Sequence, residues 1–143
     1  MSNISTGSAK YEGFGKDGKG HVSTESGALD NQPYGFNTRF EDAPGTNPEE
    51  LIGAAHASCF TMALAFQLAD KGHSAGTIET TCKVTLEKDG DGFKVSKSAL
   101  SMKGGGDGLD KATFEECAKT AKENCPLSKL LDTEITLETE FVG

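Results

Sequence analysis

The sequence has no cluster of basic residues and no leader-like start. Lysine and arginine together number 14 against 22 acidic residues, which gives a formal net charge of -8. Because phosphate binding needs clustered Lys and Arg, this balance argues against a nucleic-acid partner. Residues 1–8 lack the basic flank and apolar run of a signal peptide, so we expect a cytoplasmic protein.

Closely spaced cysteines are also missing. The four cysteines, at positions 59, 82, 117 and 125, form no Cys-x-x-Cys pair, which excludes zinc-ribbon and thioredoxin motifs. In a chain without a signal peptide, they also argue against a structural disulfide framework. Cys82 falls on the inward side of an alternating strand and Cys117 on the apolar side of a helix, so both are predicted to be core residues.

Apolar residues are few, at 35% of a chain that holds 18 glycines, yet residues 51–69 contain no charged side chain. This stretch barely reaches the ~20 residues that a membrane span needs, and it carries several polar side chains. We therefore predict no membrane span but a helix buried on all sides. A lean core beside one very apolar helix indicates that subunits share the core.

Periodicity and turn signals predict one α+β domain over residues 1–143, with antiparallel sheets and helices on one face. It divides into N-terminal strands (1–47), a central helix (48–72), and a hairpin, second helix and last strand (77–143). The expected strands cover about 10–14, 20–26, 78–87, 93–102 and 135–141, with a possible short strand around 35–40 and a bulge between 95 and 100. The second helix is expected over 111–124, after a flexible glycine loop at 104–108 and before a short helical turn at 127–131.

The start of the central helix is well marked. Asn47 is a suitable N-cap, Pro48 suits the first helical position, and Glu50 falls three residues after the cap, as in a capping box. Glu49 also lies in the first turn, where the helix dipole favours a carboxylate. Gly72 suits the C-terminal end.

Cys59 and Cys125 lie in contexts that indicate chemistry. Cys59 interrupts the apolar stretch, and Cys125 lies at a helix end directly before Pro126. A nucleophilic thiol paired with a resolving thiol is one chemistry that uses two cysteines far apart in sequence. If the two meet in space, a thiol-based redox enzyme is indicated. From the residues alone, Cys59 as a packed core residue and Cys125 as an ordinary helix-end residue remain open.

A reactive buried thiol needs a positive partner, and Arg39 is the only arginine of the chain. It precedes the Cys59 helix; a surface arginine is the other interpretation. Glu49 is suited to hold it through a bidentate ion pair. About 15 Å of straight helix would separate Glu49 from Cys59. We therefore expect a helix break near Gly53 or a site completed by a second subunit; two separate sites are the remaining alternative.

Parts of the sequence are also compatible with three other functions. His56 and Cys59 share a helix face at i, i+3 spacing and, with Cys125 or Cys82, would bind zinc, although two such ligands are a weak signal. A hydrolase using Cys59 with His56 lacks a third, orienting group. A non-catalytic stress protein that senses oxidation or binds a small molecule remains the main alternative to an enzyme.

The chain resembles the OsmC/Ohr family of hydroperoxide peroxidases over essentially its whole length. The Asn-Pro-Glu motif, a cysteine ten residues after that Glu, and a distant Cys-Pro form a specific combination. The position of the arginine in Asn37-Thr-Arg-Phe40 favours the OsmC branch. The matching segments are Gly20–Gly27, Gln32–Phe40, Gly45–Ala57 and Asn124–Pro126.

The resemblance implies a fold, an activity and a role for four residues. Cys59 would be the peroxidatic cysteine and Cys125 the resolving cysteine, while Arg39 would stabilise the thiolate and Glu49 would orient Arg39. The implied fold has antiparallel sheets wrapped around long central helices in an intertwined homodimer, with active sites at the subunit interface. No cofactor or metal is implied, but an external dithiol reductant is, and the family suggests a lipoylated protein.

The expected cycle forms a sulfenic acid on Cys59 and then a disulfide with Cys125. Apolar residues around Cys59 would favour organic hydroperoxides over hydrogen peroxide. The residues predicted to form this lining are Ile52, Phe60, Met62 and Phe40.

Overall fold

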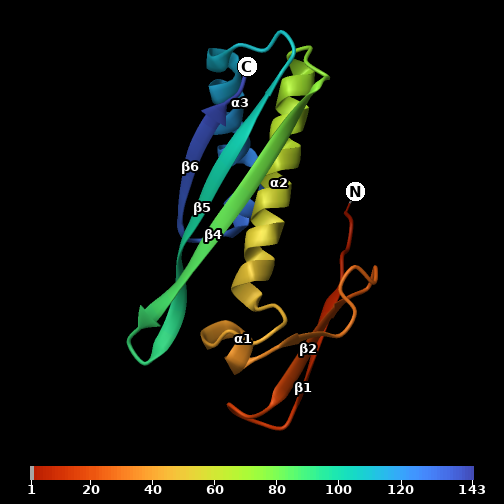
Figure 1. Ribbon diagram of the computed structural model, residues 1–143, viewed down its shortest axis with the longest axis vertical. Coiled ribbons are helices and arrows are strands. Elements are labelled where there is room, and N and C mark those ends of the chain that lie inside the picture. Colours follow the sequence, from red (N-terminus) through yellow and green to blue (C-terminus); the bar gives the residue numbers. More distant parts are fainter. Residues whose placement is uncertain (1) are drawn as a thin grey trace. The chain divides into compact units, whose positions relative to one another are not determined.

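The computed structural model describes residues 2–143, which divide into two compact units (Figure 1). The first unit extends to Leu51 and the second runs from Ile52 to Gly143. Each has its own three-stranded sheet. The single-domain organisation of residues 1–143 stays a prediction.

The first unit holds an antiparallel sheet with the strand order β1-β2-β3, followed by a short helix, α1. The possible strand around 35–40 is wrong, because these residues form α1. The Arg39 backbone N–H donates to the Gly35 carbonyl at 3.1 Å, and the Thr38 hydroxyl accepts from the Gly35 N–H at 2.8 Å. The element bounds are Gly7–Glu12 (β1), Lys19–Thr24 (β2), Gln32–Tyr34 (β3) and Phe36–Phe40 (α1).

Helix α2 covers Pro48–Asp70 and begins as predicted. The Asn47 Oδ1 accepts from the Glu50 backbone N–H at 2.8 Å, which confirms the N-cap. The Glu50 carboxylate accepts from the Thr46 hydroxyl at 2.8 Å. After the helix, Gly72 has a φ of +91°, which suits a glycine at a helix end.

The predicted helix break near Gly53 is wrong, since α2 continues through this residue. Gly53 serves close packing instead. A Cβ at this position would lie 3.0 Å from the Cys82 carbonyl oxygen, so the missing side chain lets the helix backbone approach the following strand.

The second unit contains a long antiparallel hairpin, β4 (Gly76–Asp89) and β5 (Gly92–Gly106). Thr85 pairs with Lys97 and Leu86 with Val95, so Ser96 is the extra residue of a bulge. This confirms the bulge expected between 95 and 100. Strand β5 extends to Gly106, so most of the predicted flexible loop at 104–108 is strand.

Strand β6 (Glu134–Phe141) lies beside β5 and runs parallel to it. The prediction of antiparallel sheets is therefore correct for the first sheet and for β4–β5 but wrong here. The reason is the connection: α3 (Lys111–Asn124) and α4 (Pro126–Leu130) carry the chain back across the sheet before β6 begins. Such a crossover returns the chain in the same strand direction, as a tight hairpin cannot.

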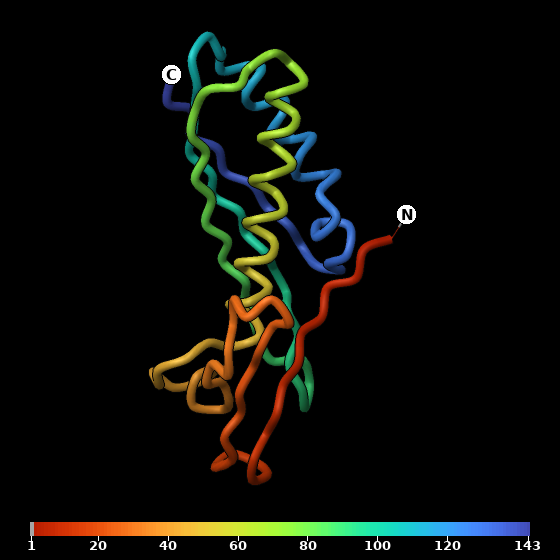
Figure 2. The backbone as a smooth tube through the Cα atoms, turned by 90° about the vertical axis from the view of Figure 1, so that its right-hand side faces the viewer, coloured from red at the N-terminus to blue at the C-terminus, as the bar shows by residue number. Residues whose placement is uncertain are grey.

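Helices α2 and α3 lie on the same face of the β4–β5–β6 sheet (Figures 1 and 2). Asp110 caps α3 by accepting from the Thr113 backbone N–H at 2.7 Å, as predicted. Cys117 is buried in the core, and the partly buried Cys82 packs against this core. The core between these helices and the sheet comprises Phe60, Leu64, Leu68, Leu100, Met102, Leu109, Phe114, Cys117, Ala118, Ala121 and Cys125.

Helix α2 is long and apolar enough to cross a membrane by length and composition alone. Its buried residues, including Phe60 and Leu64, pack in the core of the second unit. The expectation that it is buried on all sides is wrong for the single chain, where Met62 is 59% exposed and Phe66 is 67% exposed.

Candidate active site

Cys59 and Cys125 meet at the start of α4. Cys125 closes α3 and caps α4, and its Sγ accepts from the Ser128 backbone N–H at 3.4 Å. The Leu127 backbone N–H hydrogen-bonds Cys59, and the two thiols hydrogen-bond each other. Both are free thiols in this structure. The fold therefore places two cysteines, 66 positions apart in the sequence, in direct contact.

The surroundings of the two thiols differ. Burial raises the pKa of Cys59; the Leu127 N–H opposes this, and the neighbouring Cys125 adds to it. Burial alone would also raise the pKa of Cys125, but hydrogen bonds from the Ser128 hydroxyl and N–H and from Cys59 bring that pKa below its ordinary value. Within the second unit, Cys59 therefore holds its proton more tightly than Cys125.

Arg39 and Glu49 form a bidentate ion pair in the first unit. Arg39 Nε donates to Glu49 Oε1 at 2.9 Å, and Nη2 donates to Oε2 at 2.8 Å. The arginine side chain is 34% exposed and the glutamate 11%. Two parallel charge-assisted bonds fix the plane of the guanidinium, so its remaining donors have a defined direction. This is the pairing expected from the sequence.

Arg39 also borders an aromatic cavity of about 300 Å³ within the first unit. The guanidinium carbon lies 5.7 Å from the centre of the Phe40 ring, and the Phe36 and Phe40 rings are 5.0 Å apart. Phe40, one of the residues expected to line the Cys59 site, lines this cavity, and its place beside Cys59 stays a prediction. Phe60 is fully buried in the core of the second unit, so the expectation that it lines an open site is wrong. The cavity is lined by Tyr11, Gly15, Lys16, Tyr34, Gly35, Phe36, Arg39, Phe40 and Pro48.

A buried polar network lies next to the two thiols, centred on His56, whose side chain has no solvent exposure. Its Nδ1 lies 2.6 Å from Ser98 Oγ and its Nε2 lies 2.9 Å from Ser128 Oγ. Ser98 Oγ lies 3.1 Å from Cys82 Sγ, and Ser128 Oγ lies 3.5 Å from Cys125 Sγ. The network thus connects the half-buried Cys82 to the buried Cys125.

This network weakens two of the alternatives. Both ring nitrogens of His56 are engaged by serine hydroxyls, so neither is directed at Cys59 as a hydrolase would need. Among residues 2–143, no three His, Cys, Asp or Glu side chains lie close enough together to hold a metal ion. The zinc hypothesis therefore has no ligand set in the described chain.

Sequence reasoning missed Ser98 and Ser128. The signal for Ser128 was available, since it lies three residues after Cys125, where an N-cap side chain meets the backbone of the first helical turn. No comparable signal marks Ser98. It reaches His56 only because β5 packs against α2, which requires the tertiary fold.

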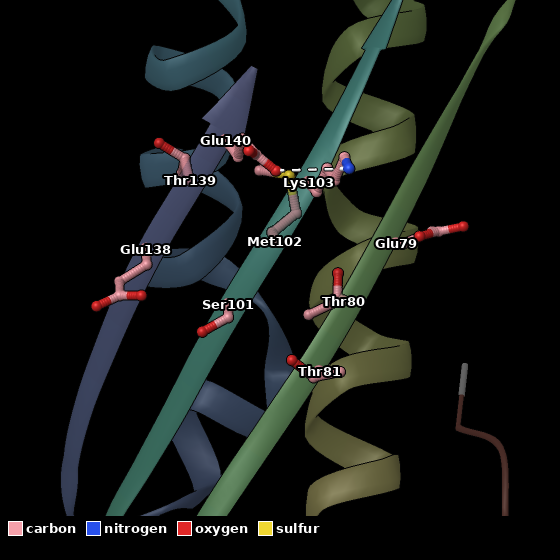
Figure 3. Close-up of a pocket in the computed structure, with 9 residues that line it drawn as sticks. All are labelled: Glu79, Thr80, Thr81, Ser101, Met102, Lys103, Glu138, Thr139 and Glu140. Atoms are coloured by element: carbon pink, nitrogen blue, oxygen red, sulfur yellow. Dashed lines mark ion pairs between the residues drawn. The ribbon is translucent and has the colours of Figure 1, made fainter. Parts of the chain in front are cut away.

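The opposite face of the second sheet carries a shallow depression of about 430 Å³ (Figure 3). Strands β4, β5 and β6 line it with mainly polar and charged side chains, among them Lys103 and Glu140, which form an ion pair at 3.8 Å. It contains neither a cysteine nor Arg39, so it lies apart from the thiol chemistry.

Known proteins resemble this chain in sequence and in fold. The profile of OsmC-like proteins matches residues 40–140. The chain is 53% identical over 135 residues, 94% of both sequences, to the protein named peroxiredoxin OsmC in Escherichia coli strain K12. This chain belongs to the OsmC family.

The similarity extends to the Ohr branch. The organic hydroperoxide resistance protein OhrB of Bacillus subtilis is 30% identical, covering 85% of this chain and 88% of OhrB. The OhrB crystal structure matches 96% of this chain and 98% of its own with a TM-score of 0.67 at 28% identity. An OsmC-like protein of Vibrio cholerae matches with a TM-score of 0.77 at 16% identity, which supports the α+β fold alone.

Proposed function

We propose that this chain is a thiol-dependent peroxidase in which Cys59 reacts with the hydroperoxide and Cys125 resolves the product. The observation that carries the proposal is the contact between the two thiols at the start of α4. The OsmC and Ohr relatives described above are named as a peroxiredoxin and as an organic hydroperoxide resistance protein. Neither is named as a sensor, so the non-catalytic alternative lacks comparable support.

The division of roles follows from access. Cys59 is only partly buried, whereas Cys125 has no solvent exposure, so a peroxide reaches Cys59 first. Because burial raises the pKa of Cys59, that thiol needs a cation to become a thiolate at neutral pH. Arg39 is our candidate for this cation, since guanidinium stays charged and Glu49 fixes its orientation.

The proposed cycle has three steps. The Cys59 thiolate attacks the distal peroxide oxygen, the O–O bond breaks, and the departing alkoxide takes a proton to become the alcohol. Cys125 sulfur then attacks the sulfenic sulfur of Cys59, the S–O bond breaks, and water leaves as the disulfide forms. An external dithiol, for which we propose a lipoylated protein, reduces the disulfide by thiol–disulfide exchange. No bound cofactor takes part.

Organic hydroperoxides are the proposed substrates. The Tyr and Phe rings of the cavity beside Arg39 offer an apolar surface to an alkyl or aryl group. The guanidinium at the rim would stabilise the negative charge that develops on the leaving oxygen. Hydrogen peroxide has no group that uses the aromatic surface, so it should be a poorer substrate.

A cytoplasmic homodimer is the proposed assembly. Within residues 2–143, the 14-residue strand β4 pairs only with β5, which leaves one edge for a further strand. Met62 and Phe66 expose apolar surface on α2. A second copy of the chain covering both features would let the subunits share a core, as the resemblance implies, and would provide a setting in which Arg39 meets Cys59.

Steady-state turnover tests this proposal. Reduced protein with a dithiol should consume cumene hydroperoxide with a higher kcat/KM than hydrogen peroxide, and Cys59→Ser should abolish consumption of both. Cys125→Ser should still react once per subunit. Cys117→Ser, which changes a buried thiol outside the pair, is the matched control and should keep turnover. A protein that loses thiols to peroxide without sustained turnover would contradict the proposal and favour the redox-sensing alternative.

A further inference from the structure

Asn47 uses both polar atoms of its side-chain amide. Its Oδ1 accepts from the Glu50 backbone N–H at 2.8 Å, which caps α2, and its Nδ2 donates to the Thr38 carbonyl at 3.3 Å. The two bonds agree on the orientation of the amide, because a backbone N–H needs an acceptor and a carbonyl needs a donor. Asn47 therefore forms a bridge from the start of α2 to the short helix α1, and this bridge lies within the first unit.

The Thr38 carbonyl belongs to the same peptide group as the Arg39 nitrogen. The N–H of this group donates to the Gly35 carbonyl at 3.1 Å, so both polar ends of the group are held. Glu49 follows Asn47 by two positions and forms the bidentate pair with Arg39. The bridge thus ties together the backbones of the two residues that form the ion pair.

Such a tie matters for an ion pair that is open to solvent. The Arg39 side chain is 34% exposed. A pair of this kind is weak when two long side chains must give up their rotational freedom to form it. A frame that already fixes both backbones lowers this entropic cost and narrows the directions in which the guanidinium points.

Capping of α2 does not by itself require asparagine. Aspartate and serine are equally good N-cap residues, but an ionised aspartate has no hydrogen to donate to a carbonyl. A serine hydroxyl ends one bond closer to the backbone and offers one polar atom in place of two, so a capping serine leaves the Thr38 carbonyl without this partner. Asparagine places an acceptor and a donor on separate atoms, and this structure uses both.

We propose that Asn47 is a positioning residue for the reaction with peroxide, which holds Arg39 and Glu49 in register so that the guanidinium presents its charge in a fixed direction. The inference rests on the proposed function, in which Arg39 stabilises the Cys59 thiolate. Asn47 acts through Arg39, with no contact to the peroxide or to the thiol.

The inference predicts a particular pH dependence. Without the bridge, the guanidinium occupies more orientations and stabilises the thiolate less, so the pKa of Cys59 rises further above its ordinary value. The thiolate fraction at neutral pH then falls, whereas the reactivity of the thiolate itself is unchanged. The rate should therefore fall at pH 7 and return to the wild-type value at high pH.

Asn47→Ser tests the bridge, because serine keeps an N-cap oxygen and adds no charge. Reduced protein is mixed with one equivalent of cumene hydroperoxide between about pH 5 and pH 9, and Cys59 oxidation is followed by rapid quenching and mass spectrometry. Asn47→Ser should slow this reaction at pH 7 by about threefold or more and shift the midpoint of the pH profile upward. In an Arg39→Ala background, the same substitution should change the rate little, because Asn47 acts through Arg39.

Two further variants separate positioning from capping. Asn47→Ala removes the cap and the bridge together, so it should unfold at a lower urea concentration than Asn47→Ser and show the same shift in the pH profile. Asp110→Ala is the matched control, because it removes the cap of α3, where Asp110 accepts from the Thr113 N–H at 2.7 Å, and leaves α1 and Arg39 untouched. It should lower stability and keep the wild-type pH profile.

The other outcomes overturn the inference in distinguishable ways. If Asn47→Ser keeps the wild-type pH profile while Arg39→Ala is slow, the bridge has no role in positioning and the proposed function stands. A loss at every pH, or an equal loss in the Arg39→Ala background, would assign Asn47 a structural role alone. If Arg39→Ala itself reacts as the wild type does, the role of Arg39 in the proposed function fails first, and the inference fails with it.

Discussion

At the scale of the residue, the two thiols differ in access and in proton affinity, and the two properties favour opposite roles. Cys125 has the lower pKa but no solvent exposure, whereas Cys59 is accessible but holds its proton more tightly. Access decides which sulfur meets the peroxide. The account therefore requires a cation beside Cys59, and we propose Arg39, the chain's only arginine.

Replacing Arg39 should expose this requirement. In Arg39→Ala, the Cys59 thiolate loses its stabilising charge, so reaction with cumene hydroperoxide at pH 7 should slow about tenfold for each unit by which the pKa rises. The rate should recover as the pH increases, and Arg39→Lys should restore it in part. Stopped-flow mixing followed by an assay of the remaining peroxide measures this rate, and Lys119→Ala is the control. A pH profile identical to wild type would contradict the assignment.

Glu49 should affect the rate with peroxide by holding Arg39 in its orientation. Glu49→Gln removes the carboxylate charge that pairs with Arg39 and loses one of the two hydrogen bonds to it, and we expect a loss of several-fold in the rate with peroxide. The same substitution in the Arg39→Ala background should have almost no further effect, because the two residues act as one unit. Glu50→Gln, one residue away and bonded to Thr46, is the control. Additive effects of the two changes would argue against a shared role.

At the scale of the element, Gly53 shows how a helix interior adapts to packing. Gly53→Val should lower the free energy of unfolding by about 1–3 kcal/mol, because the added methyl groups meet the Cys82 backbone. Ala69→Val, at an exposed position of the same helix, should cost only about 0.5 kcal/mol of helix propensity. Urea unfolding followed by circular dichroism measures both. Equal costs would show that α2 and β4 adjust without strain.

Elements with strong local signals could be predicted from the sequence, and those set by tertiary contacts could not. The cap at Asn47 and the alternation in β4 depend only on residues close together in the sequence, and the structure contains both. The parallel pairing of β6 depends on the geometry of the crossover that precedes it. The helical turn of α1 depends on the hydrogen bond that the Thr38 hydroxyl accepts from the Gly35 N–H. At the site, the four predicted residues form two close pairs. The hydrogen-bond partners of His56, Ser98 and Ser128, could be identified only in the folded chain.

At the scale of the whole molecule, the exposed apolar face of α2 should be covered by a second copy. Size-exclusion chromatography with light scattering should give about twice the 15.0 kDa mass of the chain. Phe66→Glu should shift the protein toward monomer, because a carboxylate cannot be buried unpaired at such an interface. Lys119→Glu, a charge change on α3, should leave the dimer intact. A monomeric wild type would contradict the shared-core account.

The central claim is that Cys59 and Cys125 form one redox pair, and single-turnover thiol mapping tests it most directly. Reduced protein receives one equivalent of cumene hydroperoxide, and its thiols and linkages are then mapped by mass spectrometry beside a Cys59→Ser variant. The account predicts rapid loss of two thiols as a Cys59–Cys125 disulfide in the wild type and no such loss in the variant. Unchanged thiols, or loss at Cys82 or Cys117, would contradict it.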